Sequence, residues 1–269
     1  STSDDIPYNI EGNIPYVITC VIISFGLPLT LLAIYSLYSQ VQSNNVAPIF
    51  IINLLISDIF QFCYMIVGVA KPEDLIVVIF LIIYCFGLMV SVGFMVCIAL
   101  ERYLIIAWPL WYRVRRTIKS SLVICVVVWI LPLVHVLILY VLFGTSFIIF
   151  AVFLLIPFPL LIFFLGGTLK ALSAAISVSS DEKRRIVGML VLVLLIYTLL
   201  FLPTIIMFIL AEEARDNDTF TSLIVILLRF SPLADLILYF FMRKGVIDKL
   251  LASLCCCRKD SDDNSRSSV

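Results

Sequence analysis

The stretch LIVVIFLIIYCFGLMVSVGFMVCIALERYLIIA, residues 75–107, decides the fold of this chain. It contains no charged side chain until the triplet Glu101-Arg102-Tyr103 near its end. A bilayer core about 30 Å thick is crossed by roughly 20 apolar residues in helical form, so the stretch predicts a transmembrane helix. Ionisable residues inside such a helix are costly in lipid and indicate a function, which makes the triplet the first candidate site.

The whole chain has the composition of a membrane protein. Of its 269 residues, 63% are hydrophobic and 13% are charged, and the mean hydropathy is +1.18, far from the balance of a soluble domain. Backbone groups in lipid must be satisfied within one segment, which favours helices, and the sequence lacks the alternating strands of a membrane barrel. We therefore predict an all-α membrane protein in which residues 14–242 form a seven-transmembrane helix bundle. The predicted spans are about 14–38, 46–70, 75–107, 120–142, 147–172, 184–210 and 221–242.

Charge placement predicts the orientation in the membrane. Lys and Arg gather after the third span, between the fifth and sixth spans, and after the seventh span. The positive-inside rule assigns these segments to the cytoplasm. Residues 1–13 carry acids and no basic residue, so they are predicted to form an extracellular N-terminal segment. The formal net charge of zero gives no reason to expect nucleic acid as a partner.

Several features near the chain's polar segments suggest modification. Residues 243–257 predict a short amphipathic eighth helix on the membrane surface. Cys255-Cys256-Cys257 at its end are candidates for palmitoylation, which would anchor the helix to membrane lipids, and a metal site or a chance cluster is the alternative. The Ser- and Asp-rich residues 258–269 predict a disordered cytoplasmic tail. The sequon Asn217-Asp218-Thr219 makes Asn217 a candidate for glycosylation in an outward loop.

An enzyme is disfavoured by the residues that catalysis needs. His135 is the sole histidine of the chain. The sequence shows no metal-ligand spacing, no nucleophile–base pair and no phosphate-binding loop. No catalytic residue is therefore assigned.

Motifs on five of the predicted spans carry a family resemblance. They are Asn53-Leu54-Leu55-Ile56-Ser57-Asp58 in the second span, Glu101-Arg102-Tyr103 in the third, Trp129 in the fourth, Phe201-Leu202-Pro203 in the sixth and Asp235-Leu236-Ile237-Leu238-Tyr239 in the seventh. From about Gly26 to Cys257 the chain resembles a rhodopsin-like (class A) G-protein-coupled receptor of the orphan kind. Phe25-Gly26-Leu27-Pro28-Leu29, Phe in place of Trp before the kink proline, and Asp235 look like the branch of nucleotide, protease-activated, proton-sensing and lysolipid receptors.

The resemblance implies a plasma-membrane receptor that passes the binding of an extracellular ligand to heterotrimeric G proteins by outward movement of the sixth helix. Arrestin and receptor kinases would be further partners. The G-protein switch would consist of Glu101, Arg102, Tyr103 and Tyr239, with Glu101 holding the forked Arg102 side chain at rest. Gly167 stands where the family has a Tyr that supports Arg102, and Lys183 where it often has an acid that locks Arg102. The alternative is therefore a signalling-impaired or engineered seven-helix protein that acts as a scaffold or decoy.

A polar network is expected in mid-membrane, made of Asp58, Ser91, Ser231 and Asp235. Buried carboxyl groups must become neutral, pair or bind a cation. In the family, the positions matching these residues line a pocket for an allosteric sodium ion, so Asp58 is a candidate sodium ligand. A protonated and water-bridged Asp58 without an ion is the alternative. No other cofactor is expected.

The ligand pocket is expected to include Tyr84, Tyr197, Phe201 and Arg229. A guanidinium in the membrane needs a partner, and Arg229 is suited to the carboxylate or phosphate of an anionic small molecule or acidic lipid. An ion pair with Glu212 or Glu213 is the other way to satisfy it. In the same span, Pro232 predicts a kink although Leu236 replaces the family's proline.

Overall fold

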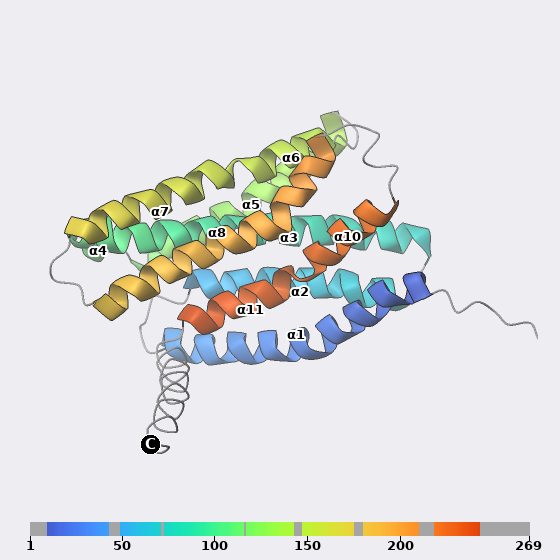
Figure 1. Ribbon diagram of the computed structural model, residues 1–269, viewed down its shortest axis with the longest axis horizontal. Coiled ribbons are helices and arrows are strands. Elements are labelled where there is room, and N and C mark those ends of the chain that lie inside the picture. Colours follow the sequence, from blue (N-terminus) through green and yellow to red (C-terminus); the bar gives the residue numbers. More distant parts are fainter. Residues whose placement is uncertain are drawn as a thin grey trace, which may run out of the picture.

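The chain folds into an all-helical bundle in which long helices lie side by side (Figure 1). The computed structural model describes residues 10–42, 49–70, 73–115, 117–142, 147–174, 180–209 and 218–242. The helices of these ranges are α1 (Ile10–Gln42), α2 (Ile49–Ala70), α3 (Asp74–Ala107), α4 (Pro109–Arg115), α5 (Ile118–Leu142), α6 (Phe147–Leu155), α7 (Pro157–Ala174), α8 (Ser180–Ile209), α10 (Asp218–Arg229) and α11 (Ser231–Met242). The predicted eighth helix, the cysteines Cys255, Cys256 and Cys257, the tail 258–269 and Asn217 lie outside the described residues.

In the part of the chain that the structure describes, seven stretches are long and apolar enough to cross a membrane, which confirms the predicted seven-helix bundle. They are Ile14–Ser39, Ile49–Ala70, Leu75–Ala107, Ile118–Leu137, Ala151–Ala174, Lys183–Ile206 and Ser222–Met242. Large apolar side chains cover the outside, such as Phe25 on α1, which is 66% exposed. An apolar exterior is what a helix bundle needs when its solvent is lipid.

Two of the spans are broken, each beside a proline. The fifth span, predicted as one helix over 147–172, is divided at Ile156 into α6 and α7. Pro157 has no backbone N–H and suits the first position of a new helix, so the helix restarts there. The seventh span is divided at Phe230, whose N–H donates to the Leu227 carbonyl at 3.0 Å in a tight turn. The kink predicted at Pro232 is thus present as a break two residues earlier.

Helix α3 lies at the centre of the bundle and packs against α2, α4, α5, α7 and α8 (Figure 1). Its segment 88–95 is buried except for Gly93, which is half-buried. Opposite this segment, the Trp129 indole on α5 donates a hydrogen bond to Asn53 Oδ1 on α2 at 2.9 Å. Two motif residues from different spans therefore meet directly.

Helix α7 approaches α3 closely at Gly167. The Tyr103 ring packs there, with its centroid 5.9 Å from that of Phe163 and 5.8 Å from that of Phe164. A Cβ atom at Gly167 would lie 2.6 Å from Tyr103 Cε2, closer than real contacts allow. The missing side chain of Gly167 therefore makes the space that Tyr103 occupies.

We expect Gly167→Ala to lower the thermal unfolding midpoint, because the added methyl group would press on the Tyr103 ring at a cost of about 1–3 kcal/mol. The midpoint of the detergent-purified protein measures this cost. Gly166→Ala is the matched control, since a Cβ there meets no atom within 4 Å. Tyr103→Leu should recover the loss in the Gly167→Ala background, whereas equal midpoints for the two alanine variants would contradict the packing described.

Candidate functional site

The predicted switch triplet lies at the end of α3, where basic residues gather. We call this the basic end of the bundle, defined by Arg102, Arg115 and Arg185. Glu101 is only 3% exposed, and its Oε1 accepts a hydrogen bond from the Tyr112 hydroxyl at 2.8 Å. The neighbouring Arg102 is half-buried. The sequence did not predict Tyr112 as a member of this site.

The Glu101–Tyr112 bond depends on a change of helix direction. Trp108 ends α3, and Pro109 starts the short helix α4 because its fixed φ and missing N–H suit a first helical position. The Tyr112 N–H then donates to the Trp108 carbonyl at 2.9 Å. This turn directs the Tyr112 side chain back at Glu101, and the sequence Trp108-Pro109 is the signal that would have suggested it.

The two tyrosines of the predicted switch occupy different helices. Tyr103 points at α7 and fills the space left by Gly167, as described above. Tyr239 is buried on α11, its ring centroid 5.2 Å from that of Phe240. Tyr103 therefore packs against the fifth span, where the resemblance placed the absent supporting tyrosine.

A bond between the sixth and seventh spans was not predicted. The Arg185 guanidinium near the start of α8 donates to the Met242 carbonyl, with Nη2 and the oxygen 2.5 Å apart. The last carbonyls of a helix have no partner within the helix and carry partial negative charge, so a cation is a suitable donor. This contact ties the two spans together at the basic end.

The predicted polar network is assembled in the interior between α2, α3 and α11. Ser91 Oγ donates to Asp235 Oδ2 at 2.9 Å. The carboxyl groups of Asp58 and Asp235 lie close enough to interact directly, and Ser231 is also fully buried. Gln61, which the sequence did not single out, donates from Nε2 to Asp58 Oδ1 at 3.2 Å.

Several oxygens of this network have no hydrogen-bond partner among the described residues. They are Asp58 Oδ2, Gln61 Oε1, Ser231 Oγ and Asp235 Oδ1. Buried polar atoms are normally satisfied. A set of carboxyl, amide and hydroxyl oxygens fits a hard cation such as sodium, and it also fits protons and water. No group of three or more His, Cys, Asp or Glu that could hold a metal occurs in the described ranges, so a cation here would depend on two carboxyl groups and neutral oxygens.

Arg229 lies at the opposite end of the bundle from the basic end. Its Nη1 donates to Thr19 Oγ1 at 2.5 Å and to the Pro15 carbonyl at 3.5 Å. These two acceptors on α1 were not predicted, although a proline and a threonine four residues apart share one face of a helix. Arg229 Nε has no partner among the described residues. Glu212 and Glu213, the alternative ion-pair partners, lie outside the residues that the structure describes.

A cavity of about 190 Å³ adjoins the Arg229 side chain. Arg229 is the one charged residue among the described residues that line it, and the others are Pro15, Tyr16, Thr19, Tyr64, Met65, Gly68 and Val69. The Tyr64 ring packs on Tyr84 with centroids 4.8 Å apart, and the Tyr84 hydroxyl has no hydrogen-bond partner among the described residues. The structure thus brings Tyr84 and Arg229 into one region.

Tyr197 and Phe201 lie elsewhere, in the packed core of the bundle. Both are completely buried, and their rings stack with centroids 5.1 Å apart. The Tyr197 hydroxyl donates to the Leu154 carbonyl, two residues before the break between α6 and α7 at Ile156. Neither residue lines the Arg229 cavity. Their contacts are those of core aromatics that support the broken fifth span.

Comparison with known proteins agrees with this architecture. Residues 29–147 match the family described as 7 transmembrane receptor (rhodopsin family). The chain is 28% identical over 137 residues to human G-protein coupled receptor 68, across 48% of this chain and 38% of that protein. It is 27% identical over 135 residues to human Mas-related G-protein coupled receptor member X1, across 49% and 42%.

Another relative is the lysophosphatidic acid receptor 6 of Gallus gallus, which is 26% identical over 137 residues, across 48% of this chain and 43% of that protein. The chain therefore spans less than half the length of the curated relatives that it matches. These relatives are receptors by name and not enzymes. The family match, the relatives and the seven membrane-length helices of the described residues together make this chain similar to the multi-pass membrane receptors of the rhodopsin family.

Proposed function

We propose that this protein is a plasma-membrane receptor that passes ligand binding to heterotrimeric G proteins. The observation that carries the proposal is the buried Glu101 at the end of α3, next to Arg102 and bonded to Tyr112. The basic loops favour an orientation with this end in the cytoplasm and the N-terminal segment outside. Arg102 would then lie where a G protein docks.

The contacts of the basic end suggest how the switch works. At rest, Tyr112 bonds to the Glu101 carboxylate, Arg102 is the next residue of α3, and Arg185 ties α8 to the end of α11. Outward movement of α8 requires the Arg185–Met242 bond to open. Arg102 can then turn into the space that α8 leaves and meet the G protein, with its forked donors available for backbone carbonyls.

Guanine-nucleotide exchange on a panel of G proteins tests this mechanism. We expect Arg102→Ala to reduce exchange about tenfold or more, because a charged contact to the G protein is lost. Arg185→Gln should act in the opposite direction and raise basal exchange, because it removes the bond that holds α8 against α11.

Two neighbouring substitutions control for loss of charge at the same end of the bundle. Lys119→Gln and Arg184→Gln each remove one exposed cation from α5 or α8, and both should leave exchange unchanged. If wild type and Arg102→Ala were indistinguishable in basal and ligand-stimulated exchange, the scaffold or decoy alternative would be favoured.

The ligand class that fits the opposite end is an anionic lipid or another small anion. Among the described residues that line the Arg229 cavity, one is a cation and none is an acid. Three of them carry hydroxyl groups: Tyr16, Thr19 and Tyr64. Its volume of about 190 Å³ is below the roughly 300–1,000 Å³ of a whole ligand site. The cavity suits the charged headgroup of a lipid whose apolar chain extends out of the cavity. Lysophosphatidic acid, for which one relative is named, is such a lipid.

Lysophosphatidic acid and its uncharged monoacylglycerol counterpart are the probes for this site. We expect Arg229→Gln to weaken the response to lysophosphatidic acid by about 2 kcal/mol or more, roughly thirtyfold, because a buried charge contact is truncated. Arg229→Lys should weaken the response less, since lysine keeps the positive charge and loses only the paired donors of the guanidinium. Dose–response curves in a calcium or cAMP assay measure the shift.

Surface expression separates ligand binding from a structural role of Arg229. Thr19→Val removes one hydrogen-bond acceptor of Arg229 and keeps the charge of Arg229. It is therefore the matched control for the structural role of the Arg229–Thr19 contact. A loss of expression in Arg229→Gln and Thr19→Val alike, with no selective change in lysophosphatidic acid potency, would contradict an anion site.

The polar network is proposed to hold an allosteric sodium ion that stabilises the resting bundle. The unpartnered oxygens of Asp58, Asp235 and Ser231 would face the ion. The ion would supply positive charge beside two carboxyl groups that share the interior, and Ser91 would orient Asp235 through its hydrogen bond.

We expect the unfolding midpoint to rise when sodium chloride replaces choline chloride, and Asp58→Asn to abolish the rise. The gain should be about 1 kcal/mol when sodium is about fivefold above its dissociation constant. Glu73→Gln, which changes an exposed acid at the start of α3, should keep the response. Equal midpoints for the wild type in both salts would favour the protonated, water-bridged network instead.

A further inference from the structure

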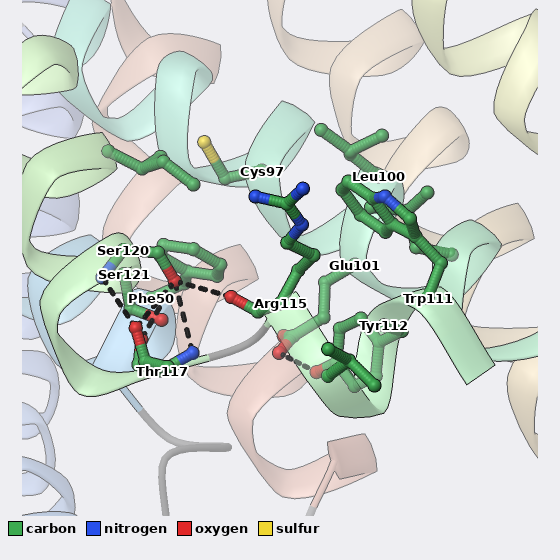
Figure 2. A pocket seen from close by; sticks show the side chains of 13 residues that line it. Phe50, Cys97, Leu100, Glu101, Trp111, Tyr112, Arg115, Thr117, Ser120 and Ser121 are labelled. Carbon is green, nitrogen blue, oxygen red and sulfur yellow. Dashed lines mark hydrogen bonds between the residues drawn. The ribbon is translucent and has the colours of Figure 1, made fainter. Parts of the chain in front are cut away.

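A second cavity, larger than the first, lies at the basic end between α3, α4 and α5 (Figure 2). Its volume is about 720 Å³, within the roughly 300–1,000 Å³ typical of ligand sites. The apolar part of its wall includes Phe50, Leu100, Leu104 and Ile124. Helix α4 and the Arg229 region near α10 lie at opposite ends of the bundle (Figure 1), so the two cavities are separate sites.

The polar groups of this cavity include Glu101 on α3, whose carboxylate accepts the hydrogen bond from Tyr112, and residues of the junction between α4 and α5. The Thr117 N–H donates to Ser120 Oγ at 3.1 Å, and Ser120 Oγ in turn lies 3.1 Å from the Arg115 carbonyl. These bonds fix the backbone that carries Arg115. Figure 2 shows the Arg115 side chain extending across the pocket, with its guanidinium between Cys97 and Leu100. A cation therefore lies over an apolar wall.

The mouth of the cavity lies on the outer surface of the bundle, where lipid would be. Trp111 and Val114, which line it, are 53% and 77% exposed. Trp108, also exposed, precedes them in the chain, and tryptophans are enriched where a membrane meets water. The basic loops predict that this interface is the cytoplasmic one, whose leaflet carries anionic lipids.

We propose that this cavity binds an acidic phospholipid of the cytoplasmic leaflet. The lipid phosphate contacts the Arg115 guanidinium, which can donate two parallel hydrogen bonds to it. Ser120 and Thr117 lie beside that position, and one acyl chain follows the apolar wall formed by Phe50, Leu100 and Ile124. The proposal needs the cytoplasmic orientation of the basic end, and it does not depend on G-protein signalling.

Photo-crosslinking of the full chain in phosphatidylcholine nanodiscs tests this site. A minor fraction of lipid carries a diazirine on its acyl chain, either as phosphatidylserine or as phosphatidylcholine. We expect phosphatidylserine to label the peptides that contain residues 97–104 and 111–124 about fivefold more than phosphatidylcholine does. Phosphatidylserine carries a net negative charge, whereas choline neutralises the phosphate of phosphatidylcholine, and one basic residue at the membrane surface supplies attraction of that order. Arg115→Gln should reduce this ratio to about one.

Matched variants separate the cavity from general surface charge. Lys119→Gln removes an exposed cation of the same junction that does not line the cavity, and should keep the preference. Ile124→Trp should block labelling by filling the cavity, whereas Val126→Trp, on another face of α5 and 55% exposed, should not. The proposal is overturned if Arg115→Gln and Lys119→Gln change the ratio equally, or if wild type labels these peptides equally with both lipids.

Discussion

Glu101 is an ionisable side chain at 3% exposure, and the arrangement of the basic end follows from how that carboxylate is satisfied. An acid cannot be buried in an apolar bundle without donors or a cation beside it. Tyr112 supplies one donor, which requires α3 to end at Trp108 and α4 to turn back towards it. The same turn places Arg115 on the wall of the large cavity. The predicted switch and the proposed lipid site thus share one structural cause.

Close packing of small residues provides the second constraint on the bundle. In lipid, helices gain little from hydrophobic burial against one another, so contact at short range decides which surfaces meet. Gly167 admits the Tyr103 ring, and Gly26 allows Phe62 to approach α1. A departure from the family pattern at Gly167 is therefore a structural feature with its own partner. The space beside Gly167, where the resemblance would place a supporting tyrosine, is filled by the ring of Tyr103 from α3.

Sequence patterns predicted the spans well because a bilayer imposes length and hydropathy on each helix separately. They also predicted that Asp58, Ser91 and Asp235 would be neighbours, through register with a family whose fold fixes those positions, and Ser91 does bond to Asp235. Contacts between spans that the quoted motifs do not include were not predictable in this way. The Arg185–Met242 bond joins a side chain to a backbone carbonyl. Every residue has such a carbonyl, so the residue type at position 242 does not indicate the bond. Tyr197 and Phe201 were expected in a ligand pocket, but aromatic residues at helical spacing look the same whether they line a cavity or fill a core.

What the sequence by itself determined is the class of the molecule: seven apolar helices and a charged triplet at the end of the third span, while the orientation favoured by the basic loops stays a prediction. Each of these depends on local composition or on charge, which are properties of a segment and its solvent. The tertiary structure alone decided where the charges find partners. Arg229 on α10 bonds to Thr19 and Pro15 on α1, more than 200 residues earlier in the chain. Glu101 on α3 bonds to Tyr112 on α4, across the change of direction between these two helices. Such pairings depend on distances between helices, and these are fixed only when all the spans pack together.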